Sequence, residues 1–340
     1  MKTVHVKDAI GMILGHDMTE IIPGERKGVA FRKGHIIKEE DIPKLLNIGK
    51  ENVYVMEFSE DDVHEDEAAI RMAKAAAGPG IEITGPKEGK ATLVAEYRGL
   101  LKVDVDALLD MNSTDEIMFA SLGGNIVVEK GEAVAGTRVI PLVVKDWQVK
   151  KAERICGGPS PVIQVKPFRK LKAGVVTTGN EVYYGRIKDK FGPVVRGKFE
   201  ELDCSVIKQI FSKDDPQMIA ESIRELIDSG ADIITVTGGM SVDPDDVTPL
   251  GIKMAGADIL SYGAPTLPGA MFLLSYIGEI PVLGLPGCVM YSKRTIMDLL
   301  LPRIVAGERV ERRDIVKLGQ GGYCRNCVDC RYPNCGFGKS

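Results

Sequence analysis

The sequence has few aromatic residues and no excess of positive charge. Phe, Trp and Tyr make up 6% of its 340 residues, and there is a single Trp. The 44 Lys and Arg residues face 48 Asp and Glu residues, which gives a formal net charge of -4. Because nucleic-acid binding relies on basic surfaces and stacking rings, these two shortages argue against nucleic acid as a partner.

Long apolar segments are also missing. The nearest candidate, residues 270–277, is far shorter than the roughly 20 residues that a transmembrane helix needs. Residues 1–8 are mixed and polar, unlike the apolar segment of a secretory signal. We therefore expect a cytoplasmic protein with no membrane partner.

The length of 340 residues exceeds that of an ordinary single domain. Hydrophobic residues at 44% and charged residues at 27% are typical of globular proteins. Turn-rich boundaries and changes of hydrophobic pattern divide the chain into four parts. These are an N-terminal α+β region (1–77), a β-rich domain with a basic linker (78–165), an α/β domain (166–307) and a cysteine-rich tail (308–340).

The β-rich part is expected to contain one short helix, over residues 114–120. The basic residues of the segment 145–172 favour two interpretations. The segment is either a solvated connector between domains or a positive rim that steers a phosphorylated ligand.

The third part alternates between short β-branched runs and helical patterns. Helices are expected over residues 194–202, 216–230, 250–255 and 289–305, and strands over 173–177, 205–211, 231–236, 258–261, 271–276 and 280–283. This alternation predicts a three-layer α/β/α domain with a mostly parallel sheet.

Three of the expected strands end in unusual loops, at residues 178–181, 238–246 and 284–287. In open α/β sheets, ligands bind beyond the carboxyl ends of the strands, so we expect the three loops to meet at one pocket. Free backbone N–H groups at Gly238 and Gly239 suit an anion. The carboxylates beside them would repel a bare anion unless a divalent cation lay between, which indicates a metal-assisted phosphate or pterin site.

These loops resemble the molybdopterin-binding domain shared by molybdopterin adenylyltransferases and molybdenum insertases, the molybdopterin molybdenumtransferases. The resemblance covers about residues 172–307. It is carried by the Thr-Thr-Gly-Asn-Glu-Val motif at 177–182, the Gly-Gly-Met-Ser-Val-Asp-Pro-Asp-Asp motif at 238–246 and the Leu-Pro-Gly motif at 285–287. Residues 1–144 resemble a divergent version of the additional insertase domains.

The resemblance implies a transferase of molybdenum cofactor biosynthesis. It assigns binding of molybdopterin, free or adenylated, to Thr178, Gly179, Asn180, Gly238, Gly239, Ser241, Pro286 and Gly287. Glu181, Asp189 and Asp246 would be the catalytic residues, placing Mg²⁺ or orienting molybdate. The product would pass to a molybdoenzyme acceptor, and we expect a homo-oligomer.

One departure from the insertase pattern supports an alternative function. Insertases have a Lys in a Pro-Gly-Lys-Pro segment, whereas residues 267–271 read Leu-Pro-Gly-Ala-Met. Without that charge, the protein could be a non-catalytic molybdopterin carrier or sensor that serves a molybdenum hydroxylase. Cys288 follows the Pro-Gly motif, either as a thiol with a lowered pKa or as a small buried apolar residue.

The tail contains Cys324, Cys327, Cys330 and Cys335 within a polar stretch. Four thiolates at such close spacing match either a tetrahedral zinc site or an iron–sulfur cluster. The first two gaps agree with a ferredoxin-like run, and the last gap is one residue longer. We therefore expect a metal centre in the tail, iron–sulfur rather than zinc.

Overall fold

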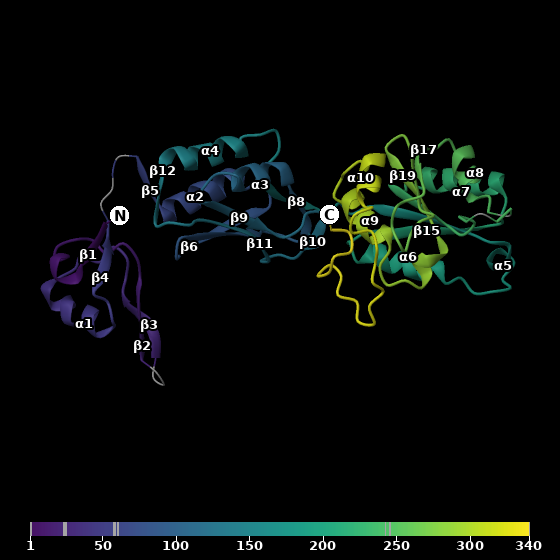
Figure 1. Ribbon diagram of the computed structural model, residues 1–340. Helices are drawn as coiled ribbons and strands as arrows, with labels where there is room; N and C mark the ends of the chain where they lie inside the picture. The colour runs from purple at the N-terminus through teal and green to yellow at the C-terminus, as the bar shows by residue number, and fades with distance from the viewer. Residues whose placement is uncertain are drawn as a thin grey trace. The chain divides into compact units, whose positions relative to one another are not determined.

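The computed structural model describes residues 2–22, 26–56, 59, 61–241, 243–244 and 246–339. The chain forms two compact units, whose elements Figure 1 labels. The first unit comprises residues 1–97, 102–122 and 130–165, and the second comprises residues 98–101, 123–129 and 166–340. The finer four-part division based on sequence stays a prediction.

The first unit begins with short elements around a small core. β1 (Lys2–His5) pairs antiparallel with β4 (Asn52–Val55), and β2 (Met18–Ile22) pairs antiparallel with β3 (Arg26–Phe31). The connecting helices are η1 (Val6–Asp8), η2 (Glu39–Asp41) and α1 (Ile42–Asn47). Leu14, Met18 and Leu45 are buried together in this core.

A four-stranded sheet forms the rest of the first unit. Its order is β6 (Ile81–Lys87), β7 (Lys90–Ala95), β11 (Ala133–Val139) and β9 (Ile117–Ser121), with antiparallel neighbours throughout. Helices α2 (Glu65–Ala76), α3 (Val105–Asn112) and α4 (Asp146–Cys156) lie along one face of this sheet (Figure 1). The short strands β5 (Asp62–His64) and β12 (Val143–Lys145) pair beside α2.

Two expectations for these segments are wrong. Residues 114–120 were expected to be helical, but they lead into strand β9, where Ile117 and Phe119 alternate inward and the Asn112 side chain bonds to both backbone groups of Phe119. The segment 145–172 was expected to be a basic linker, but it contains α4 and β13 (Ile163–Pro167). Val149 and Ala152 are buried on one face of α4, while its basic residues lie elsewhere on the helix.

The second unit contains a six-stranded sheet. Its order is β15 (Ser205–Ser212), β14 (Lys172–Thr178), β16 (Ile233–Thr237), β19 (Ile280–Leu285), β18 (Leu273–Ile277) and β17 (Asp258–Tyr262). The first four strands are parallel to one another, and the last two add antiparallel pairings. The central strands are buried on both faces, as the short β-branched runs predict.

Helices cover both faces of this sheet, which confirms the predicted three-layer α/β/α architecture. Side chains of α7 (Pro216–Asp228) and α8 (Thr248–Met254) pack on one face, in a core that includes Val176 and Ile234. Side chains of α6 (Phe191–Glu200) and α9 (Ile296–Val305) pack on the other face. Asp215 caps α7 by accepting a hydrogen bond from the Met218 N–H, at the boundary that the Asp-Pro pair predicts.

The expected single helix over residues 289–305 is wrong. The 3₁₀ turn η3 (Gly287–Met290) comes first, and α9 begins later at Ile296. Thr295 and Asp298 form a capping box, and this local signal sets the start of the helix.

The remaining elements of the second unit are short. α5 (Asn180–Tyr183) follows β14, and α10 (Arg312–Lys317) precedes the tail. β8 (Gly99–Val103) pairs antiparallel with β10 (Ile126–Val128), and Val127 packs against the core that α6 and α9 share. Within the described ranges, no helix is long and apolar enough to cross a bilayer.

Candidate functional site at the carboxyl edge of the sheet

A cavity of about 520 Å³ lies where β14 and β16 end. It is the place at which parallel α/β sheets bind ligands. Its lining residues come from four loops: Thr178, Gly179, Glu181, Val182, Ile187, Lys188, Asp189, Lys190, Phe191, Asp214, Gly238, Gly239, Asp243, Asp246 and Met290.

Most of the residues assigned from sequence line this cavity. They are Thr178, Gly179, Glu181, Asp189, Gly238, Gly239 and Asp246. Four others, Asn180, Ser241, Pro286 and Gly287, lie outside its lining, and the third loop instead contributes Met290. The first two loops therefore meet as expected, whereas the Pro-Gly loop reaches the cavity only through the end of its 3₁₀ turn.

Gly238 and Gly239 occupy conformations that other residues rarely adopt. Their φ angles are +90° and +54°. A Cβ at Gly238 would lie 2.6 Å from the backbone oxygen of Thr178, and one at Gly239 would lie 2.8 Å from the hydroxyl oxygen of Thr248. The two glycines thus let the loop pass directly over the end of β14.

Three buried threonines hold this crossing in place. The Thr178 hydroxyl donates to the Thr237 carbonyl oxygen at 3.1 Å, and the Thr248 hydroxyl donates to the Gly238 carbonyl oxygen at 2.8 Å. The hydroxyl oxygens of Thr178 and Thr248 lie 3.3 Å apart. Thr248, at the start of α8, lies in the stretch that the sequence singles out, but it was not assigned to the site, because a Thr-Pro pair is typical of an ordinary helix start.

Asp246 shapes the acidic loop that contains it. Its carboxylate accepts hydrogen bonds from the backbone N–H groups of Ser241, at 2.8 Å, and Asp243, at 3.2 Å. From β17, the Tyr262 hydroxyl donates to the carbonyl oxygen of Met240 at 3.0 Å. Burial, together with the charge of Asp246, raises the pKa of Tyr262, so this phenol remains a proton donor.

Asp189 lies at the start of α6. Its carboxylate accepts the backbone N–H groups of Phe191, at 2.8 Å, and Gly192, at 3.1 Å. The Gln209 amide also donates to it at 2.7 Å and to the Thr177 hydroxyl at 2.9 Å. Gln209 on β15 is a positioning residue that the sequence did not indicate, since it is 20 residues away along the chain.

Glu181 is the most exposed of the three predicted carboxylates, and it lies next to Gly179. A Cβ at Gly179 would come within 2.9 Å of the Glu181 carboxylate oxygen. The neighbouring Asn180 N–H donates to the Asp214 carboxylate at 2.9 Å. Glu181 is therefore an exposed carboxylate that lines the cavity and lies close to the Gly179 backbone.

Lys188 and Lys190 bring positive charge to the same cavity. Both are exposed, and they flank Asp189 in the sequence. The sequence could have indicated this positive charge, because two lysines on either side of a predicted site residue suit a phosphate group.

Cys288 is half-buried in η3, and burial raises the pKa of its thiol. The interpretation as a thiol with a lowered pKa is therefore wrong, and the apolar alternative agrees with its surroundings. Across the parts of the chain that the structure describes, no three His, Cys, Asp or Glu side chains are already grouped to hold a metal ion.

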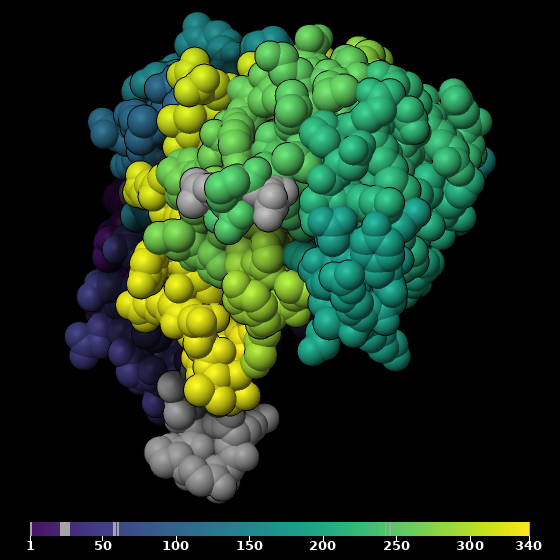
Figure 2. Space-filling model, turned by 90° about the vertical axis from the view of Figure 1, so that its right-hand side faces the viewer, coloured from purple at the N-terminus to yellow at the C-terminus, as the bar shows by residue number. Residues whose placement is uncertain are grey.

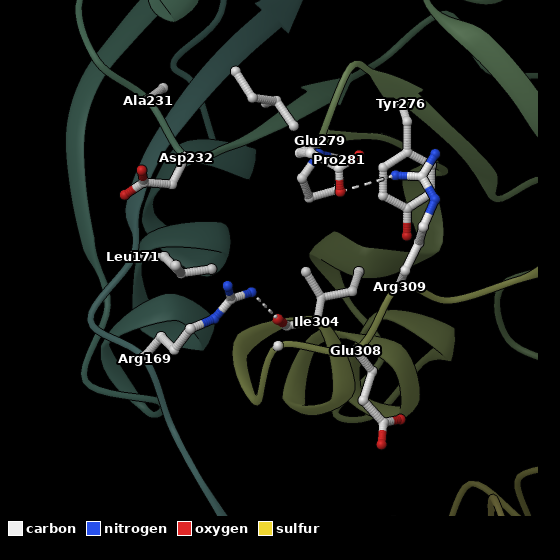
Figure 3. Close-up of a pocket in the computed structure, with 12 residues that line it drawn as sticks. Arg169, Leu171, Ala231, Asp232, Tyr276, Glu279, Pro281, Ile304, Glu308 and Arg309 are labelled. Carbon is white, nitrogen blue, oxygen red and sulfur yellow. Dashed lines mark hydrogen bonds and ion pairs between the residues drawn. The ribbon is translucent and has the colours of Figure 1, made fainter.

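A second cavity, of about 300 Å³, lies near the amino ends of β14 and β16 (Figure 3). Its arginines are engaged within the protein. Arg169 donates to the Ile304 carbonyl oxygen at 3.1 Å, and Arg309 lies 4.1 Å from the centre of the Tyr276 ring and 3.4 Å from Glu279. The mixed charges and existing contacts make this cavity a weaker candidate than the one at the carboxyl edge.

The α/β domain matches a known protein family. Residues 174–306 match the family model of the probable molybdopterin binding domain. The match covers nearly all of the six-stranded sheet together with α5 to α9. Residues 3–57 match a domain of unknown function (DUF8806).

Relatives with similar sequences share only part of the chain. The CinA-like protein of Mycobacterium avium (strain 104) is 36% identical over 77 residues, which are 23% of this chain and 18% of that protein. The CinA-like protein of Mycobacterium tuberculosis (strain ATCC 25618 / H37Rv) is 34% identical over 77 residues, which are again 23% of this chain and 18% of that protein. This chain thus matches less than a fifth of the length of these relatives.

Solved structures also show partial similarity. The molybdopterin biosynthesis enzyme MoaB of Thermus thermophilus is 20% identical, covering 41% of this chain and 98% of that chain at a TM-score of 0.33. CinA of Thermoplasma acidophilum is 20% identical, covering 39% and 98% at a TM-score of 0.35.

Proposed function

We propose that the second unit binds molybdopterin, free or adenylated, and that the protein acts in molybdenum cofactor biosynthesis or maturation. The proposal rests on one observation. The family match over residues 174–306 contains both loops that build a cavity of about 520 Å³ at the carboxyl edge of the sheet. Small-molecule sites typically have volumes of roughly 300–1,000 Å³, so the cavity suits a ligand of this size.

The phosphate of the ligand is assigned to the glycine loop. Gly238 and Gly239 line the cavity, and glycines let an anion approach backbone N–H groups closely. Lys188 and Lys190 lie along the same cavity and attract a phosphorylated ligand.

Mg²⁺ fits the donor set of the cavity. This ion usually takes one or two protein carboxylates and completes its coordination with phosphate oxygens and water. Asp189 and Asp246 already accept backbone N–H groups, while Glu181 is exposed at the cavity. We therefore assign the first contact with Mg²⁺ to Glu181, with Asp189 and Asp246 holding their loops in place.

The finer proposal is a molybdopterin molybdenumtransferase. The two dithiolene sulfurs of adenylated molybdopterin would bind molybdenum in place of one molybdate oxygen, which would leave with the two thiol protons as water. Water would then add to phosphorus as the phosphoanhydride bond to AMP breaks, so that AMP leaves. Positioned charges and backbone N–H groups suit this step, because they stabilise the charge that develops on phosphate oxygens.

The second candidate is a molybdopterin carrier or sensor without turnover. The segment 267–271 lacks the insertase Lys, and Leu267 is hydrogen-bonded to the tail at Gly322 and Cys324. A segment held in this way supports binding better than it supports molybdate transfer. Service to a molybdoenzyme and assembly as a homo-oligomer stay predictions.

The test combines a binding and a turnover measurement on the full chain. Isothermal titration with molybdopterin measures binding, and chromatography of the reaction with adenylated molybdopterin, Mg²⁺ and molybdate measures AMP release. Glu181→Gln removes the exposed charge, and Asp246→Asn removes a charge while keeping an acceptor for the loop N–H groups. The matched control is Asp258→Asn, on the edge strand β17.

The transferase predicts AMP release that requires molybdate and is reduced in Glu181→Gln and Asp246→Asn but not in the control. Binding without AMP release supports the carrier instead. If the wild-type chain does not bind molybdopterin at all, both candidates are refuted.

A further inference from the structure

The four tail cysteines lie on a loop whose two ends meet. The Gly338 N–H donates to the Gly321 carbonyl oxygen at 2.9 Å, so the chain closes on itself around the intervening residues. Cys324, Cys327, Cys330 and Cys335 all lie within this closed loop. The loop thus brings the cysteines into one small region without any regular helix or strand.

The body of the second unit holds this loop at its base. The Leu267 N–H donates to the Gly322 carbonyl oxygen, and the Cys324 N–H donates to the Leu267 carbonyl oxygen, each at 2.8 Å. Figure 2 shows the yellow tail lying against the light-green residues that precede it. The base of the loop is therefore a fixed part of the fold.

Aromatic side chains anchor the far side of the loop. The Tyr332 hydroxyl donates to the Asp298 carbonyl oxygen at 3.2 Å, and the Arg294 guanidinium lies 5.2 Å from the centre of the Tyr332 ring. Phe337 is only 4% exposed and packs edge-on against Tyr332. These contacts fill the space between the loop and α9 without using any cysteine.

The four cysteines line a common space. All four cysteines are free, and all four line one cavity of about 570 Å³. Cys327 and Cys330 are exposed, so they contribute little to packing. Arg325 and Arg331 line the same cavity, and their charges would offset those of several thiolates, whereas Arg294 is paired with Glu201 and Asp298.

The backbone at Cys324 already has a feature of a thiolate ligand. The Asn326 N–H donates to the Cys324 sulfur at 3.5 Å, and Asn326 has a φ of +54°. This turn directs a peptide N–H at sulfur, and such hydrogen bonds stabilise a metal-bound thiolate. Since no three ligands are grouped at metal distance among the described residues, the exposed cysteines must move inward when metal binds.

We propose that the closed tail loop is a tetrathiolate metal site, formed by Cys324, Cys327, Cys330 and Cys335. The site takes either a [4Fe–4S] cluster or a zinc ion, because four thiolates are the ligand set of both. It is independent of the pterin cavity and of the proposed function. Metal binding draws the exposed half of the loop toward the anchored half.

The full chain is purified without oxygen, and its iron, acid-labile sulfide and zinc are measured per chain. The metal-free protein is also incubated with ferrous iron and sulfide, or with zinc alone, and its absorption spectrum is recorded. The test variant is Cys327→Ser/Cys330→Ser, because both side chains are exposed and their change leaves the packing intact. The matched control is Cys288→Ser, which lies outside the tail.

We expect one metal centre per chain, present in the control and lost in the double variant. Iron with an equal amount of sulfide and a visible charge-transfer absorption identifies the cluster, and zinc with no visible band identifies the ion. Two results would overturn the proposal: no metal bound under any of these conditions, or the same metal content in the double variant as in the wild type.

Discussion

The Thr248 hydroxyl donates a 2.8 Å hydrogen bond to the backbone carbonyl oxygen of Gly238. This bond joins the start of α8 to the first residue of the glycine loop. Thr248 is fully buried and Gly238 is half-buried, so the hydrogen bond is largely shielded from water. The conformation of the proposed phosphate-binding loop therefore depends on a side chain outside the motif.

Replacement of Thr248 by Val should weaken the second unit and its ligand binding. Val has nearly the shape of Thr but leaves the Gly238 carbonyl oxygen without its donor. An unsatisfied buried polar group costs about 1–3 kcal/mol, and we expect that decrease in the free energy of unfolding. Urea titration followed by circular dichroism measures it, and titration with molybdopterin measures binding. Thr248→Ser keeps the hydroxyl and should retain most of both; equal losses in the two variants would contradict this account.

A methyl group at Gly238 should reduce the stability of the protein far more than one at Gly230. Both glycines have similar φ angles, +90° and +85°. A Cβ at Gly230 meets open space, whereas one at Gly238 would lie 2.6 Å from the Thr178 backbone oxygen. Gly230→Ala should cost roughly 1–2 kcal/mol, the penalty of a left-handed conformation alone.

Gly238→Ala should lower the free energy of unfolding by more than Gly230→Ala does, and it should also abolish binding of molybdopterin. Thermal unfolding compares the stabilities of the two variants, and isothermal titration compares their affinities. Equal stability and equal affinity would show that the close crossing of the two loops is unimportant.

The strands and helices around the site could be predicted because their signals are local. Residues 233–237 are buried on both faces and form a β-branched run, which is typical of a central parallel strand. Asp215 and Pro216 mark the start of α7 in the sequence and in the structure alike. By contrast, α4 was missed because its basic face dominates the composition of that segment.

The parts of the site that escaped prediction depend on tertiary contacts. Gln209 reaches Asp189 only because β15 lies beside β14 in the sheet. Met290 lines the cavity because η3 ends before α9 begins, whereas a continuous helix was expected. A sequence pattern reports which residues share a strand or helix, but it does not report which side chains meet across elements.

Lys198 and Asp298 form a buried ion pair between α6 and α9, with 2.7 Å between Nζ and Oδ1. Their side chains are 8% and 4% exposed. Lys198→Met removes one of the two cations that contact the Asp298 carboxylate, because Arg294 also lies 2.8 Å from Oδ1. Complete loss of a buried partner typically costs about 3–5 kcal/mol, and the remaining Arg294 contact keeps the expected loss at the lower end, about 3 kcal/mol. We expect a decrease of this size in the free energy of unfolding, measured by urea titration.

The matched control for this pair lies on the surface of the same unit. Lys208 and Glu225 are separated by 2.6 Å, but their side chains are 43% and 56% exposed. Exposed pairs contribute less than about 1 kcal/mol, so Lys208→Met should have little effect. Similar losses in the two variants would mean that burial does not determine the importance of the Lys198–Asp298 pair.

In the first unit, Asp62 and Lys145 face each other across the paired strands β5 and β12. The Lys145 ammonium donates to the Asp62 carboxylate at 2.6 Å, and the Ser59 N–H donates at 3.1 Å. The hydrogen bond from Lys145, followed by that from Ser59, lowers the pKa of Asp62 from 3.8 to about 2. Because the folded pKa is lowered, any stabilisation is present above pH 3.8 and is lost as the pH falls through about 2.

Lys145→Met should therefore raise the pKa of Asp62 toward its ordinary value. Carboxyl carbon NMR shifts of Asp62, followed from neutral to acidic pH, measure the change directly. Lys150→Met is the matched control, because Lys150 pairs with Asp146 at 2.6 Å and leaves the Lys145 bond intact. An unchanged Asp62 pKa in Lys145→Met would show that Ser59, rather than the cross-strand ammonium, causes the depression.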